Sequence, residues 1–346
     1  MYVEYRLDSV KQIANMSSEE VVSREVEYLL AETKYVCSLD EKSLAKAKKE
    51  LNENPRERQA AVDQLREWIL QQPHFKCCTD TRFLLMFLRR SAFSQLEARA
   101  LIENYVAVIC TKLAFWGKDI DTHSKSLKSA LEVGVLIPLP IPDDEGRRII
   151  LNTPGCIKSG KGYTNFDILK ATYAIMTYLV QFDEATQVNG IVVIDDQTNV
   201  TPKVMTYIGL DNLVKVLSFF MNKYPIRMKG WHFYNAAVVA QTIISALKPF
   251  LPQKIQDRMF LYGNNMEDVY KHIPMRLLPR EYLPDEYTGP CQGSLSAIQA
   301  SYKKALNSKA VRDKIWNITS SGMTYDETKK PGDVGPQASF RKLNID

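Results

Sequence analysis

The stretch that decides the fold runs from Tyr224 to Gly263 and reads YPIRMKGWHFYNAAVVAQTIISALKPFLPQKIQDRMFLYG. It predicts a short aromatic strand over Trp231–Tyr234, followed by an apolar helix over Ala236–Leu247. Lys248-Pro249 then breaks that helix, and a basic helical turn follows. The polar face of the apolar helix carries almost no charge, so both of its faces tolerate an interfacial environment. The segment therefore predicts a mobile lid that opens at a membrane surface.

The lid helix carries a wide apolar stripe at helical spacing. We expect this stripe to face a ligand when the lid is closed and the bilayer when it is open. The alternative is a helix that simply packs on a core. The residues expected to face the ligand are Val239, Ile243, Leu247, Phe250 and Leu251.

Cations bracket the lid on both sides. Arg227 and Lys229 are two residues apart and point the same way in an extended segment. Lys254 and Arg258 are four apart and share a helical face. Together they suit a phosphorylated lipid head group, because phosphate accepts several charge-assisted hydrogen bonds. The alternative is ordinary solvated surface charge.

Outward from this stretch, short strands alternate with helices. Ile191–Ile194 is a continuous apolar run that ends in Asp195-Asp196, as a buried central strand does. Alternation of this kind predicts an α/β sandwich with a mainly parallel sheet. The other expected strands are 148–151, 231–234 and 259–262, and the expected helices are 165–183, 202–222 and 294–316.

Before this α/β region the chain predicts only helices. Pro55 opens one helix, Asp80 caps a second over Thr81–Arg90, and Ser94 with Glu97 forms a capping box for a third. We interpret this part as a helical bundle without a site of its own. The predicted domains are a helical domain over 1–120, a lipid-binding domain over 121–290, and a carboxy-terminal helix with a flexible tail over 291–346.

Composition sets further limits. The chain has 346 residues, a net charge of +5 and 45% hydrophobic residues, which is typical of a globular protein and too weakly basic to indicate nucleic acid. The start lacks a secretory signal and no apolar run could span a bilayer, so we expect a cytoplasmic protein with reduced cysteines. The motifs of α/β hydrolases, P-loops and dinucleotide folds are absent, and the histidines lack metal-ligand spacing. We therefore expect no catalytic residue, no cofactor and no metal.

At this point several segments resemble, in order, the CRAL-TRIO lipid-transfer family. They are FLLMFLRR, ALEVGVLIPLPIPDDEGRRIIL, QVNGIVVIDD, YPIRMKGWHFYN, LKPFLPQKIQDRMFLYGNN and LLPREYLPDEYTG, and the resemblance covers roughly residues 40–290. It implies an amino-terminal helical bundle, then an α/β sandwich whose sheet and lid helix enclose one hydrophobic molecule. Contact with a phosphoinositide-bearing membrane would open the lid.

The resemblance also implies roles for single residues. Arg227, Lys229, Lys254 and Arg258 fall on basic phosphoinositide-binding positions of a tocopherol-binding member, while a further arginine of that cluster is replaced by Ser91, next to Arg90. Tyr173, Thr177 and Asp195 fall where members that bind tocopherol or retinaldehyde have polar residues near the ligand. Phe219 is expected in the apolar wall.

The sequence thus predicts an intracellular carrier for a retinoid, a tocopherol or a related isoprenoid, with peripheral and reversible attachment to phosphoinositide membranes. Two alternatives stay open. One is a phosphoinositide-regulated interaction protein without a transfer role, and the other is an esterase or dehydrogenase on an α/β fold. Identification of the bound molecule separates the first from a carrier, and a turnover assay tests the second.

Overall fold

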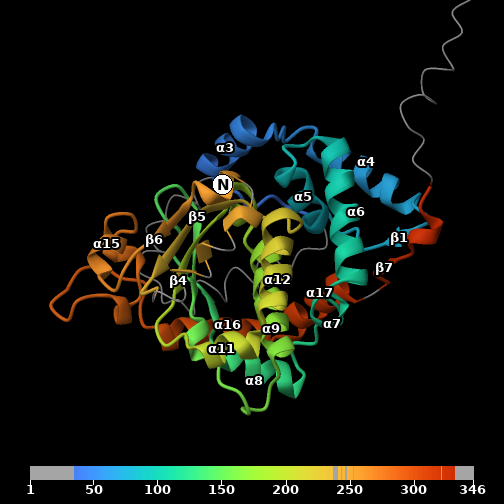
Figure 1. The fold of residues 1–346 in the computed structure, drawn as a ribbon. Coiled ribbons are helices and arrows are strands. Elements are labelled where there is room, and N and C mark those ends of the chain that lie inside the picture. Colours follow the sequence, from blue (N-terminus) through green and yellow to red (C-terminus); the bar gives the residue numbers. More distant parts are fainter. Residues whose placement is uncertain are drawn as a thin grey trace, which may run out of the picture.

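A five-stranded sheet lies at the centre of the computed structural model, which describes residues 35–236, 241–242, 244–245, 248–251, 253–320 and 322–331 (Figure 1). The strand order is β2-β3-β4-β5-β6. β2 runs antiparallel to β3 and all other neighbours are parallel, which confirms the predicted mainly parallel sheet. The strands are β2 (Leu136–Pro138), β3 (Arg148–Asn152), β4 (Ile191–Asp196), β5 (Met228–Tyr234) and β6 (Met259–Leu261).

The central strand β4 follows from its sequence. Its first five residues are buried, because neighbouring strands and covering layers enclose it from every side. β5 begins three residues before the predicted strand, at Met228, so Lys229 belongs to the sheet. β2 was not predicted, since three residues with a proline give almost no alternation to detect.

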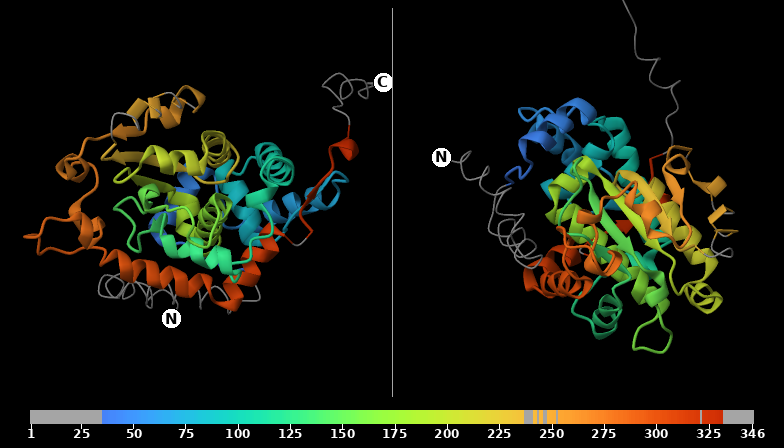
Figure 2. Two further views of the ribbon diagram at one scale, coloured as in Figure 1. Left: turned by 60° about the horizontal axis from the view of Figure 1, so that its bottom comes forward. Right: turned by 90° about the vertical axis from the view of Figure 1, so that its left-hand side faces the viewer.

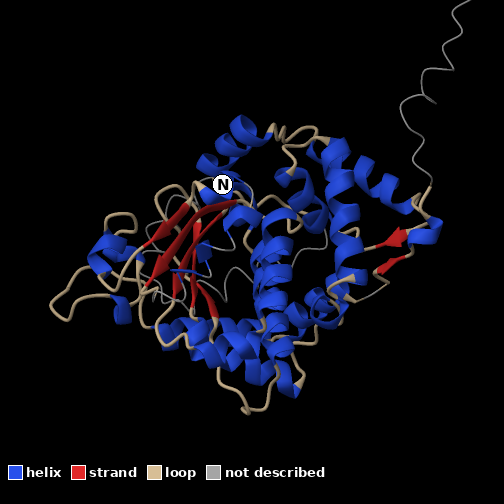
Figure 3. Cartoon of the chain, viewed as in Figure 1, coloured by secondary structure: helices blue, strands red, loops and turns tan. Residues whose placement is uncertain are grey.

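Helices α9, α11 and α12 cover one face of the sheet (Figures 1 and 3). α9 (Asn165–Phe182) begins with a complete capping box between Thr164 and Asp167. The single helix predicted over 202–222 is two helices, α11 (Pro202–Ile208) and α12 (Leu210–Asn222). Gly209 separates them with a φ of 82°, a value that a residue with a Cβ rarely adopts.

The described amino-terminal part is mainly helical, as predicted, but it also contains the two-residue strand β1 (Phe75–Lys76), so the expectation of helices alone is wrong. The Asp80 side chain caps α5, and that of Ser94 caps α6 by accepting from the backbone of Glu97. The helix expected to open at Pro55 begins instead at Arg58, after a turn. The described helices of this part are α3 (Glu41–Leu51), α4 (Arg58–Leu70), α5 (Thr81–Arg90), α6 (Gln95–Thr111) and α7 (Ala114–Gly117).

The carboxy-terminal segment differs from the prediction in two ways. The single helix expected over 294–316 is broken where Ser308 caps a new helix, giving α16 (Leu295–Leu306) and α17 (Lys309–Thr319). The tail was predicted to be flexible from Ser320, and for residues 322–331 this is wrong. β7 (Thr324–Tyr325) pairs antiparallel with β1 (Phe75–Lys76) of the helical part (Figures 1 and 2). The last fifteen residues lie outside the described residues.

One continuous apolar core runs through the helical part, the sheet and the carboxy-terminal helices. The domain boundaries at 120 and 290 remain predictions. The remaining helices connect or cover the layers: α8 (Lys125–Val133), α10 (Glu184–Asn189), α14 (Gln253–Gln256) and α15 (Met266–Tyr270).

Among the described residues no single helix has the length and apolarity to cross a membrane. The pair α11 and α12, bent by 67°, could do so by length and composition alone.

Candidate functional site

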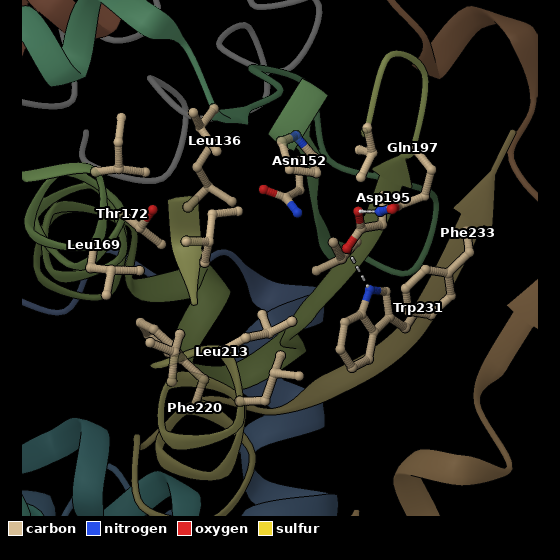
Figure 4. A pocket seen from close by; sticks show the side chains of 18 of the residues that line it. Leu136, Asn152, Leu169, Thr172, Asp195, Gln197, Leu213, Phe220, Trp231 and Phe233 are labelled. Atoms are coloured by element: carbon tan, nitrogen blue, oxygen red, sulfur yellow. Dashed lines mark hydrogen bonds between the residues drawn. The ribbon is translucent and has the colours of Figure 1, made fainter. Parts of the chain in front are cut away.

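A cavity of about 420 Å³ lies between the sheet and the helices α9, α11 and α12 (Figure 4). Its volume falls in the range of small-molecule sites. Alternate residues of β4 form part of its floor, because side chains of a strand alternate between the two faces of a sheet. On β5 a shift in register after Met228 interrupts the alternation, so that Met228 and Trp231, three residues apart, lie on the same face. Those floor residues are Ile191, Val193 and Asp195 from β4 and Met228, Trp231 and Phe233 from β5.

The opposite wall comes from α9, α11 and α12. On α9, Asn165, Ile168, Leu169, Thr172 and Met176 follow helical spacing and so face the cavity together. On α12, Leu213, Val216, Leu217, Phe220 and Met221 do the same. The lining is therefore almost wholly apolar.

The polar groups of the floor meet at Asp195. The Trp231 Nε1 donates to Asp195 Oδ2 at 3.2 Å, and the Gln197 side-chain amide donates to Asp195 Oδ1 (Figure 4). Asn152, at the end of β3, lies in register beside Asp195 and also lines the cavity. Burial raises the pKa of Asp195 to about 6, although hydrogen bonds from Asn152, Trp231 and Gln197 lower it. At neutral pH this carboxylate is charged and offers only acceptors.

Two predicted head-group residues, Tyr173 and Thr177, are not among the residues that line the cavity. Tyr173 is fully buried, and its hydroxyl is hydrogen-bonded to that of Tyr105 on α6. Its ring packs against Trp116 and Tyr224. The two residues thus lie on the side of α9 that meets the helical part, while their helix neighbours Thr172 and Met176 face the cavity.

Phe219, which was predicted in the apolar wall, also lies off the cavity, and its neighbour in the sequence takes that place. It packs among the rings of Tyr105, Trp116 and Tyr173, and Phe220 next to it lines the cavity. α12 is apolar on more than one side, so spacing alone did not distinguish these two faces.

The lid is only partly described. Val239, Ile243 and Leu247 lie outside the described residues, and so does the side chain of Phe250, whose backbone forms a short 3-10 turn over Lys248–Phe250. Leu251 is buried and lines the cavity. Ile244, which was not predicted, also lines it.

The structure brings three of the four predicted cations together at the start of β5. Arg227 and Lys229 lie side by side with side chains 19% and 18% exposed. Arg258 donates to the carbonyl of Met228 in the same strand. Lys254 lies exposed on α14. Desolvation and then the charge of Arg227 lower the pKa of Arg90, so this arginine belongs to the same surface, whereas Ser91 is buried.

Sequence comparison gives consistent relatives. The CRAL/TRIO domain model matches residues 133–283. The chain is 32% identical over 254 residues to the Alpha-tocopherol transfer protein-like of Mus musculus, covering 72% of this chain and 71% of that protein. It is 28% identical over 313 residues to Clavesin-2 of Rattus norvegicus, covering 89% and 91%. Among solved structures, the crystal structure of Sfh5 covers 79% of this chain and all of its own, with 10% identity and a TM-score of 0.43, which says nothing about function.

Proposed function

This chain belongs to the CRAL-TRIO family, and on that premise we propose that it is a lipid-binding protein that carries one hydrophobic molecule and exchanges it at phosphoinositide-containing membranes. The observation that carries the proposal is the enclosed apolar cavity with polar groups gathered at one corner. The name of the mouse relative, which mentions alpha-tocopherol transfer, supports the same class of ligand.

The polar corner supports a ligand with one hydrogen-bond donor. Trp231 and Gln197 already donate to Asp195, and a carboxylate has further lone pairs that accept. A buried ligand hydroxyl needs such a partner, because an unsatisfied one costs about 1–3 kcal/mol. We therefore favour a retinoid or tocopherol-like isoprenoid that ends in a hydroxyl.

The membrane part of the proposal rests on the cations at β5. Arg227, Lys229 and Arg258 meet at one edge of the sheet, and Lys254 lies exposed on the following helix α14. Phosphoinositide head groups carry clustered phosphates, which bind such groups by charge-assisted hydrogen bonds. Val239, Ile243, Leu247 and Phe250 stay the predicted lid stripe, which we expect to face the ligand when the lid is closed and the bilayer when it is open.

Lipid extraction of the purified protein, followed by mass spectrometry, tests the carrier proposal. One enriched isoprenoid alcohol is expected. A set of lipids that mirrors the bulk composition of the host membrane would contradict a selective carrier and favour the phosphoinositide-regulated interaction protein.

Thr172→Trp should block the cavity. Thr172 faces the cavity from α9, and the added indole occupies volume that the ligand needs (Figure 4). Overpacking costs about 1–3 kcal/mol, so we expect retinol or alpha-tocopherol to bind roughly ten- to a hundred-fold more weakly. Titration followed by ligand fluorescence measures this. Thr111→Trp on the exposed side of α6 introduces the same ring outside the cavity and should bind like wild type.

Tyr173→Phe tests whether this side of α9 contributes to stability rather than to ligand binding. Tyr173 bonds to Tyr105 and lies off the cavity, so the variant should keep wild-type ligand affinity. It should lower the free energy of unfolding by about 1–3 kcal/mol, since the Tyr105 hydroxyl loses a buried partner. A ten-fold loss of affinity for retinol, with no loss for a hydrocarbon analogue, would return the head-group role to Tyr173.

Lys229→Ala with Lys254→Ala should weaken binding to phosphatidylcholine vesicles that contain phosphatidylinositol bisphosphate by about 1 kcal/mol per charge. Added salt should mimic the loss, since it screens these charges. The matched control is Lys309→Ala with Lys329→Ala, which removes the same charge from exposed carboxy-terminal positions. Equal vesicle binding by both double variants at low salt would contradict the site.

A further inference from the structure

An acidic side chain of the helical part lies on the basic surface of β5. Glu50, in the last turn of α3, places Oε2 at 2.6 Å from Arg227 Nη2 and at 3.7 Å from Lys229 Nζ. The hydrogen bond from Arg227 lowers the pKa of Glu50, so this carboxylate is charged. A carboxylate in this position occupies the groups that a phosphate would use.

Contacts on both sides of this ion pair hold Arg227 and α3 in place. Arg227 donates its other terminal nitrogen to the carbonyl of Val188, which holds the guanidinium toward α3. Val188, on α10, packs in a small apolar cluster with Ala47 and Leu51 of α3. α3 is thus anchored by its apolar face, and its one glutamate at this end reaches the cations.

The charges on this surface do not balance. The positive charge of Lys46 on α3 helps to lower the pKa of both Glu50 and Lys229, and the charge of Arg258 also contributes to lowering that of Lys229. Burial and then Arg227 lower the pKa of Lys229, as expected for cations that crowd each other. Arg90 faces Arg227 from α5, with Glu97 as its own acidic neighbour. Glu50 is the acidic group that bridges Arg227 and Lys229, and it leaves the surface with an excess of positive charge.

We propose that Glu50 is an intramolecular competitor of the lipid head group, which occupies the Arg227–Lys229 pair until a polyphosphorylated membrane lipid displaces it. A phosphate carries more charge and more acceptor oxygens than a carboxylate, so it replaces Glu50 on the same donors. Lys46 and Arg90 then extend the site onto the helical part. This inference rests on the proposed phosphoinositide function and specifies how that site is regulated.

Glu50→Gln tests the competition, with Glu41→Gln as its matched control. Both variants change the net charge equally on the same helix, and Glu41 lies at the other, exposed end of α3. The full chain is bound to phosphatidylcholine vesicles with phosphatidylinositol bisphosphate, and separately to vesicles in which phosphatidylserine supplies the same surface charge. Glu50→Gln should bind the phosphoinositide vesicles roughly five-fold more tightly than Glu41→Gln, as one competing charge near a surface predicts.

Glu50→Asp keeps the net charge and shortens the reach to Arg227. It should bind the phosphoinositide vesicles more tightly than wild type. A change in net charge cannot explain such a result, because both side chains carry the same charge. Equal binding by Glu50→Gln and Glu41→Gln, with wild type still selective for phosphoinositide, overturns the competitor role and leaves the site intact. If wild type and both variants bind the two kinds of vesicle alike, the phosphoinositide function itself is wrong, and the inference falls with it.

Discussion

Replacing Arg89 by methionine should lower the free energy of unfolding by about 3–5 kcal/mol, the usual cost of breaking a buried ion pair. The Arg89 side chain is fully buried. Its Nε and Nη2 donate to Glu53 at 2.9 and 2.8 Å, and its Nη1 donates to Gln187 at 2.8 Å. Nη2 also lies 2.8 Å from Glu184. Methionine fills most of the volume but leaves two buried carboxylates without this cation.

The position of these carboxylates explains the size of the effect. Glu53 follows α3 and Glu184 begins α10, so Arg89 joins the helical part to the part that contains the five-stranded sheet. Burial alone would raise the pKa of Glu184, yet Arg89 and hydrogen bonds from Tyr35 and Ser38 lower it to about 2. Without Arg89 the charged form of Glu184 loses its main source of stabilisation.

Urea denaturation followed by circular dichroism measures the loss, with Arg90→Met as the control. Arg90 is the next residue on the same helix and is exposed, so its replacement should change the stability by about 0.5 kcal/mol or less. An Arg89→Met protein that is as stable as Arg90→Met would show that the network contributes nothing to folding.

In wild type, ionisation of Asp195 should lower the free energy of unfolding by about 3 kcal/mol as the pH rises, and Asp195→Asn should abolish this loss. In the unfolded chain this carboxyl ionises near its ordinary pKa of 3.8, whereas in the folded protein burial raises the pKa to about 6. Between these values the folded state binds more protons than the unfolded state, so wild-type stability from this group falls as the pH rises. Asparagine does not ionise and removes this dependence.

The measured quantity is the difference in unfolding free energy between Asp195→Asn and wild type, from below pH 4 to pH 7. This difference should rise in favour of the variant and level off above about pH 6. The difference is needed because His232 acts in the opposite direction: burial and His272 lower its pKa to about 4, so its contribution grows with pH. A difference that stays constant over this range would mean that Asp195 is as well solvated in the cavity as in the unfolded chain.

Local sequence was enough for most of the secondary structure. A cap acts over three or four residues, so Asp80 and Ser94 mark the starts of α5 and α6 without reference to the rest of the chain. The apolar run at Ile191–Ile194 likewise predicts a buried parallel strand by itself. The breaks at Gly209 and Ser308 were missed, because an apolar stripe that continues on both sides of a break looks like one long helix.

Contacts between distant segments could not be predicted in this way. β7 pairs with β1 across roughly 250 residues, although the composition of the tail is typical of a flexible segment. Glu50 lies in the sequence among lysines of an ordinary solvated helix, and only the packing of α3 against Val188 brings it to Arg227. Helical spacing identifies a face of α3, but it does not identify what that face meets.

The sequence alone determines the family, the mainly parallel sheet and the position of Asp195 near the end of the central strand, because these follow from local patterns and their order. Which side of α9 lines the cavity is a tertiary property. Nearly all of that helix beyond its first turn is buried, so apolar and aromatic residues occur all round it and periodicity cannot separate the faces. The packing of Tyr173 against Tyr105 turns that residue toward the helical part, and Thr172 and Met176 line the cavity.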